Sequence, residues 1–138
     1  MMPRSFRTAS LAAPALALFL LAGCATTPGA PPVAQLDGSY SGTINIMGET
    51  LFASMDVTQE GSALELRLSL PDIALASEGE GVATLEGFRA EVPYTLTCPG
   101  TALFDGTLQE DGRTVSGSVE ATDCDGTMSG TFRFTRRN

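Results

Sequence analysis

The side chains that could do chemistry in this 138-residue chain are three cysteines, many serines and sixteen carboxylates, with no histidine and no lysine. A serine or cysteine nucleophile normally needs a base within hydrogen-bond reach, and the usual nitrogen bases are missing. A carboxylate pair can hydrolyse glycosides, but the sequence singles out no pair among the sixteen. The missing histidine also removes the commonest metal ligand. We therefore expect a protein that is not an enzyme and uses no cofactor.

An N-terminal leader precedes the first cysteine. Arg4 and Arg7 come before an apolar run from Leu11 to Ala22, the layout of a cleaved secretory signal, and this run is too short to span a bilayer. The four residues Leu21-Ala22-Gly23-Cys24 resemble the lipobox of bacterial lipoproteins. The resemblance implies that residues 1–23 are a signal peptide and that the mature protein begins at Cys24.

The same resemblance implies a membrane anchor. The thiol of Cys24 would carry diacylglycerol, and its new amino group would carry a further acyl chain such as palmitate. The next residue is Ala25 rather than aspartate. By similarity to lipoprotein sorting in diderm bacteria, this residue implies that the lipid-anchored protein lies in the cell outer membrane and faces the periplasm.

If Cys24 carries lipid, Cys98 and Cys124 are the two remaining thiols. An oxidising compartment favours a bridge between them. Turns of an antiparallel meander alternate between the two ends of the sheet, so the turns expected at Pro99-Gly100 and at Asp123 to Gly126 lie at the same end. Bending of these turns could bring the two Cα atoms within the roughly 4.4–6.8 Å that a disulfide needs. We expect a structural disulfide, because no CxxC spacing tunes a thiolate.

Two acidic groups could attract a hard cation such as calcium. The first, Asp123-Cys124-Asp125-Gly126, lacks the alternating aspartates and terminal glutamate of an EF-hand loop, so we interpret it as a turn fixed by a disulfide. The second group consists of Glu78, Glu80, Glu86 and Glu91, and we interpret it as a solvated face. We expect no metal site.

Composition divides the chain into three parts. Residues 1–23 are the signal peptide, residues 24–36 are the lipidated cysteine and a proline-rich flexible linker, and residues 37–138 are a single β-domain with one core. After removal of the leader, six arginines face sixteen acidic residues. Nucleic acid is a poor partner for such a surface.

From Asp37 onward apolar residues recur at every second position, the spacing of a strand with one buried face. The clearest strand alternates Leu64, Leu66, Leu68 and Leu70 with polar residues and ends at Pro71. Other strands are expected at Tyr40–Ile46, Leu51–Val57, Ile73–Ser77, Val82–Glu86, Phe88–Cys98, Ala102–Leu108, Val115–Val119 and Met128–Phe134. We expect Ile44, Leu66, Leu68, Phe104, Val119 and Phe132 in the core.

Glycine and proline set the expected connections. We expect turns at Met47-Gly48-Glu49, at Gln59 to Ser62 and, tightly, at Asp111-Gly112. Glu78-Gly79-Glu80-Gly81 would join a weaker hairpin, and Pro93 indicates a sheet edge or a bulge. The pattern predicts an all-β, antiparallel meander of about eight strands that closes into a small barrel, with a β-sandwich as the alternative.

A pattern DGxxSGT occurs at 37–43 and 125–131, and again with one inserted residue at 111–118. It predicts that the first and last strands are neighbours in a closed barrel. This layout is similar to the small eight-stranded barrels of the lipocalin-like (calycin) class, a likeness of architecture alone. Four glycines in the apolar phase would either relieve crowding or leave a cavity for an apolar ligand: Gly42, Gly106, Gly117 and Gly130.

Two functions fit these features. The first is a non-enzymatic envelope lipoprotein that presents its small β-domain to a periplasmic protein or an envelope polymer. The alternative is a carrier that holds a small apolar ligand inside the barrel.

Overall fold

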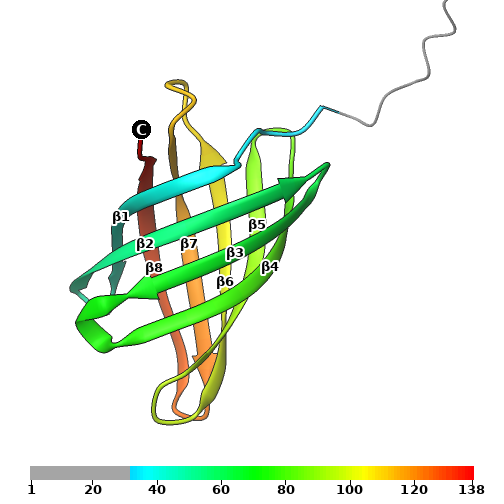
Figure 1. Ribbon diagram of the computed structural model, residues 1–138. Coiled ribbons are helices and arrows are strands. Elements are labelled where there is room, and N and C mark those ends of the chain that lie inside the picture. The colour runs from blue at the N-terminus through cyan, green and yellow to red at the C-terminus, as the bar shows by residue number, and fades with distance from the viewer. Residues whose placement is uncertain (1–31) are drawn as a thin grey trace, which may run out of the picture.

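The computed structural model describes residues 32–138, and Cys24 and the expected signal peptide lie outside this range (Figure 1). Eight antiparallel strands pair in meander order and close into a barrel, which decides between the barrel and the sandwich. The strands are β1 (Gly38–Ile46), β2 (Glu49–Glu60), β3 (Ala63–Leu70), β4 (Leu75–Ala83), β5 (Gly87–Thr95), β6 (Pro99–Leu108), β7 (Thr114–Asp123) and β8 (Gly126–Arg136), with one 3-10 turn, η1 (Pro71–Ile73), between β3 and β4.

The barrel closes where β1 pairs with β8, as the repeated pattern predicts. Gly42 and Gly130 occupy equivalent positions in the two DGxxSGT copies. A Cβ added at Gly42 would overlap the carbonyl of Arg133 on β8, and one added at Gly130 would overlap the carbonyl of Asn45 on β1. The repeated glycine therefore lets the two strands approach closely at the seam.

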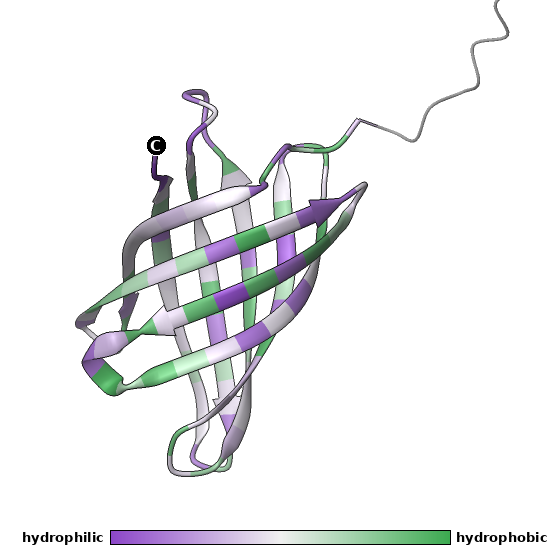
Figure 2. Ribbon diagram, in the orientation of Figure 1, coloured by the Kyte–Doolittle hydropathy of each residue, from purple (hydrophilic) through white to green (hydrophobic). Residues whose placement is uncertain are grey.

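The core lies inside the barrel, and all six residues expected there are buried. Inward and outward positions alternate along the strands, which gives the banded colouring of β2, β3 and β4 in Figure 2. The ring of Phe132 contacts those of Phe104 and Phe134 at centroid distances of 5.3 and 5.5 Å. A Cβ on Gly106 would lie 2.6 Å from Phe88 and 2.8 Å from Phe132. Gly106 makes room for two rings, so this glycine relieves crowding and does not leave a cavity.

The middle of the chain differs from the expected weak hairpin. Residues on both sides of Glu78 to Gly81 belong to one strand, β4, which pairs with β3 over its whole length. The turn comes later, at residues 84–86. A Cβ on Gly79 or Gly81 would overlap a carbonyl of β5, that of Glu91 or of Arg89. These glycines therefore allow close strand contact and do not form a turn.

Two other expected turns are also displaced. Pro99 and Gly100 begin β6 instead of forming a turn, and residues 96–98 make the connection from β5. The β6–β7 connection covers residues 109–113 and is longer than a tight Asp111-Gly112 turn. The carboxylate of Asp111 stabilises it by accepting hydrogen bonds from the backbone N–H groups of Arg113 and Thr114, both at 2.8 Å.

Pro93 was expected at a sheet edge or a bulge, and in the closed barrel it lies at a position of β5 that is paired with β6 alone. The register of β4 with β5 stops at Glu80 opposite Glu91, so Pro93 lies beyond the paired stretch. On its other side Pro93 is opposite Thr101 of β6.

Candidate functional site

One end of the barrel is closed by the segment that precedes β1. Ala34 and Leu36 are buried although they lie in the proline-rich stretch. The side chain of Gln59 accepts a hydrogen bond from the N–H of Leu36 at 2.7 Å and donates one to the carbonyl of Ala34 at 2.9 Å. The hydroxyl of Tyr40 donates to the carbonyl of Leu36 at 2.8 Å and accepts from Arg136 at 2.8 Å. These contacts seal this end of the barrel.

Little space remains beneath this cap. The cavity among the side chains there measures about 10 Å³. That volume is about the minimum for one water molecule and is far too small for an organic ligand.

The opposite end of the barrel is open, and we call it the mouth. It carries the β1–β2, β3–β4, β5–β6 and β7–β8 connections, at the lower left and bottom of Figure 1. An apolar cavity of about 220 Å³ lies inside it. All eight strands contribute to its wall, through Ile44, Leu51, Leu68, Leu75, Val92, Phe104, Val119 and Met128 among others.

Two small side chains leave this space empty. Ala102 of β6 and Ala121 of β7 are directly opposite each other in the strand register and both line the cavity. Toward the other end of the barrel, the rings of Phe88 and Phe132 fill the space in front of Gly106 of β6. The mouth is therefore the part of the interior where a ligand can be accommodated.

Large apolar side chains surround the mouth on the solvent side. Met47 in the β1–β2 turn is 74% exposed, Leu96 in the β5–β6 connection is 46% exposed, and Ile73 in η1 is 37% exposed. All three line the cavity. Exposed apolar groups that converge on a cavity are typical of a binding site, whereas isolated ones are common on any surface.

Tyr94 connects the cavity wall to the edge of the mouth. Its hydroxyl donates a hydrogen bond to the carboxylate of Asp123 at 3.1 Å. Burial, followed by this hydrogen bond and the negative charge of Asp123, raises the pKa of Tyr94 above its ordinary value of 10.0. The phenol therefore stays protonated and remains a donor.

Cys98 and Cys124 form a disulfide beside this hydrogen bond, with Cα atoms 6.2 Å apart. Because β6 and β7 are antiparallel neighbours, the start of β6 lies next to the end of β7, and the two cysteines meet there. The sulfurs lie close to the carboxylates of Asp123 and Asp125. Since both sulfurs are used in the bridge, they are not available as thiolate ligands, and the turn is one fixed by a disulfide.

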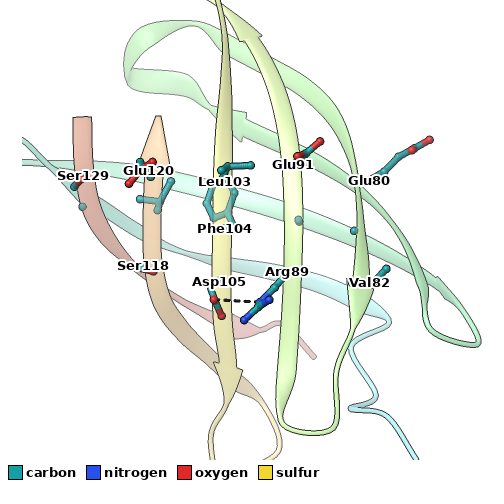
Figure 3. A pocket seen from close by; sticks show the side chains of 14 residues that line it. Glu80, Val82, Arg89, Glu91, Leu103, Phe104, Asp105, Ser118, Glu120 and Ser129 are labelled. Atoms are coloured by element: carbon teal, nitrogen blue, oxygen red, sulfur yellow. Dashed lines mark ion pairs between the residues drawn. The ribbon is translucent and has the colours of Figure 1, made fainter. Parts of the chain in front are cut away.

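A second concave region lies on the outer face of β4 to β8, and we call it the outer hollow (Figure 3). It is a shallow depression of about 680 Å³. Val82 and Leu103 are exposed in it, and Arg89 and Asp105 form an ion pair at 3.3 Å along it. Its other outward side chains are mostly acidic or small, including Glu80, Glu91, Glu120, Ser118 and Ser129.

The residues singled out from the sequence have different outcomes. Cys24 lies outside the described residues, whereas Cys98 and Cys124 are joined as expected. The four glutamates Glu78, Glu80, Glu86 and Glu91 are all exposed, and Glu78 pairs with Arg67 at 3.0 Å. The residues around the mouth were not expected as a site. Met47 gave a partial signal, as an apolar residue in an expected turn, whereas Ile73 and Leu96 were expected in strands and lie in connections of the structure.

No family model matches the chain, and no curated protein matches it. Within residues 32–138, no helix has the length and apolar character needed to cross a membrane.

Proposed function

We propose that this chain is a non-enzymatic, lipid-anchored protein of the bacterial envelope that binds the apolar part of a small ligand in the mouth of its barrel. One observation supports this proposal above all. The apolar cavity of about 220 Å³ opens between the exposed side chains of Met47, Ile73 and Leu96, while the other end of the barrel is filled. This cavity gives a specific binding site to the alternative function, a carrier that holds a small apolar ligand.

The position of the tether fits this proposal. The chain enters the barrel at the closed end, where Ala34 and Leu36 are buried, and the mouth lies at the opposite end. An anchor at Cys24 would therefore attach the closed end to the membrane. The mouth would open toward the periplasm, where it could receive a ligand.

The anchor itself can be tested at Cys24. Stable attachment needs two or more acyl chains, since a single chain binds only marginally. We expect that Cys24→Ser blocks processing and releases the domain from the outer-membrane fraction. If the Cys24→Ser protein is processed normally and stays in the membrane, the anchoring proposal is wrong.

Native mass spectrometry tests ligand binding. Residues 24–138 with Cys24→Ser, exported behind a signal peptide that is cleaved without lipidation, would be purified from the cells that express them and measured without denaturation. A binding protein retains extra mass, and this mass is lost on unfolding. Ala121→Leu, which fills the cavity, should abolish the extra mass, and Val82→Ser in the outer hollow should not. A native mass equal to that of the bare chain contradicts the proposal.

The outer hollow supports a second candidate function, presentation of the domain to a periplasmic protein or an envelope polymer. The supporting observation is that Leu103 of β6 and Val82 of β4 are exposed among acidic groups in a hollow that spans five strands. Co-sedimentation with isolated cell-wall polymer tests the polymer form of this candidate. The protein should sediment with the polymer, and Leu103→Ser together with Val82→Ser should prevent it, whereas Ala121→Leu should not.

A further inference from the structure

The mouth of the barrel is acidic. The strand ends and connections that form it are residues 44–51, 68–76, 92–104 and 119–128, and they contain no arginine. The same residues contain five carboxylates, those of Glu49, Asp72, Glu120, Asp123 and Asp125. Any charged group that approaches the cavity from solvent therefore meets negative charge.

The arginines lie elsewhere on the barrel. The six in the described part of the chain are Arg67, Arg89, Arg113, Arg133, Arg136 and Arg137. The ion pairs found among residues 32–138 join Arg67 to Glu78, Arg89 to Asp105 and Arg137 to Asp56. None of these pairs includes a carboxylate of the mouth. The negative charge at the mouth is consequently not neutralised by residues 32–138.

Two of these carboxylates accept hydrogen bonds that hold them in place next to residues of the cavity wall, and a third lines the cavity. Asp123 accepts hydrogen bonds from the hydroxyl of Tyr94 at 3.1 Å and from the N–H of Asp125 at 2.9 Å. Asp72, in η1, accepts from the N–H of Phe52 at 3.1 Å. Glu49 lines the cavity itself. A charged headgroup at the mouth would meet two carboxylates, those of Asp72 and Asp123, that are already held by hydrogen bonds and need not be ordered first.

The size of the cavity limits the apolar part of the ligand. Its volume of about 220 Å³ is below the roughly 300–1,000 Å³ of ordinary small-molecule pockets. It can hold the end of one slender chain. The remainder of the ligand must stay at the edge, between the apolar side chains of Met47, Ile73 and Leu96 and the carboxylates.

From this combination we propose that the ligand of the mouth is a cationic amphiphile, with one apolar chain in the cavity and a positively charged head among Glu49, Asp72 and Asp123. The inference rests on the proposed function and specifies its ligand class. Fatty acids and other anionic amphiphiles are disfavoured, because their heads would face like charges.

Isothermal titration calorimetry can test this ligand class on the mature chain, residues 24–138 with Cys24→Ser. The cap and the barrel lie wholly within this chain, at residues 33–136. The probes are decyltrimethylammonium, decyl maltoside and decyl sulfate, each below its micelle-forming concentration. These three amphiphiles share one chain length and differ in head charge. We expect decyltrimethylammonium to bind at least about tenfold more tightly than decyl sulfate, with decyl maltoside between them.

A matched pair of double variants assigns the preference to the mouth. Glu49→Gln with Asp72→Asn should remove most of the preference for the cation over decyl maltoside. Glu60→Gln with Glu110→Gln changes the net charge equally at the closed end and should keep the preference. High salt should weaken binding of the cation and leave the neutral probe unaffected.

The outcomes separate the two proposals. Equal binding of the three probes, or tighter binding of decyl sulfate, would overturn the proposal of a cationic ligand. Either result would still support the proposed apolar binding site. A preference that survives Glu49→Gln with Asp72→Asn would also overturn it. If none of the probes binds to a chain whose circular dichroism shows an intact barrel, both proposals fail.

Discussion

The hydroxyl of Tyr94 on β5 reaches over β6 to donate to the carboxylate of Asp123 at the end of β7. Gly100 on the intervening strand permits this contact. A Cβ at Gly100 would lie 2.7 Å from the Tyr94 ring and 2.8 Å from the Cβ of Asp123. The contact fixes the position of one carboxylate of the mouth relative to the cavity wall, beside the disulfide.

Removal of this hydroxyl should have a small, measurable effect. Tyr94→Phe keeps the ring in the cavity wall and deletes the hydrogen bond to Asp123. We expect a loss of about 0.5–1.5 kcal/mol in the free energy of unfolding, measured by urea denaturation. In an Asp123→Ala background the same change should cost less, because the partner is already gone. An equal cost in both backgrounds would show that the hydrogen bond contributes nothing.

The disulfide should stabilise the barrel substantially. It links residues 26 positions apart, and closing a loop of about 27 residues contributes about 3.5 kcal/mol in the chain-entropy model. The double variant Cys98→Ser, Cys124→Ser should lose stability of this order in the same urea measurement. Free-thiol labelling of the unfolded, unreduced mature protein should find neither cysteine reactive. Two reactive thiols would mean that the bridge does not form in the cell.

Truncation inside and outside the barrel should separate buried from exposed positions on β3. Leu66 is buried and Glu65 beside it is exposed. Leu66→Ala should cost about 2–5 kcal/mol of unfolding free energy, the usual range for a buried leucine, and Glu65→Ala should cost little. Comparable costs for the two variants would show a register shifted by one residue.

The fold was largely predictable, because alternation such as that of Leu64, Leu66 and Leu68 depends only on local sequence. Glycine caused the main error in the fold. Gly79 and Gly81 look like a turn in sequence, yet they lie in β4 where a neighbouring backbone comes too close for a side chain. That contact is set by the coiling of the closed barrel and is not visible in a local pattern.

The site was harder to predict than the fold. The disulfide followed from counting cysteines and from the alternation of turns. The cavity depends on how side chains from eight strands fill the interior, and in particular on Ala102 and Ala121 being opposite each other. No single stretch of sequence carries that information.

The loop between β6 and β7 should make stability depend on acid pH. Hydrogen bonds from the Thr114 hydroxyl and the N–H groups of Arg113 and Thr114 lower the pKa of Asp111 from 3.8 to about 2. A depressed pKa stabilises the fold above the unfolded-state value, and this contribution is lost as the pH falls through about 2. Thermal unfolding should show Asp111→Asn less stable than the natural chain near neutral pH, with the difference shrinking from about pH 4 downward. A difference independent of pH would contradict this assignment, and Glu110→Gln is the control in the same loop.

Methyl NMR of the methionines tests the binding site in the mouth most directly. Residues 24–138 contain three methionines: Met47 and Met128 line the mouth cavity, and Met55 lines the small space at the closed end. With ¹³C-methyl-methionine labelling, titration with decyl maltoside should shift the Met47 and Met128 signals in a saturable way and leave Met55 in place. Ala121→Leu should suppress these shifts. Signals that stay unchanged at Met47 and Met128, or shifts of equal size at Met55, would contradict a ligand site in the mouth of the barrel.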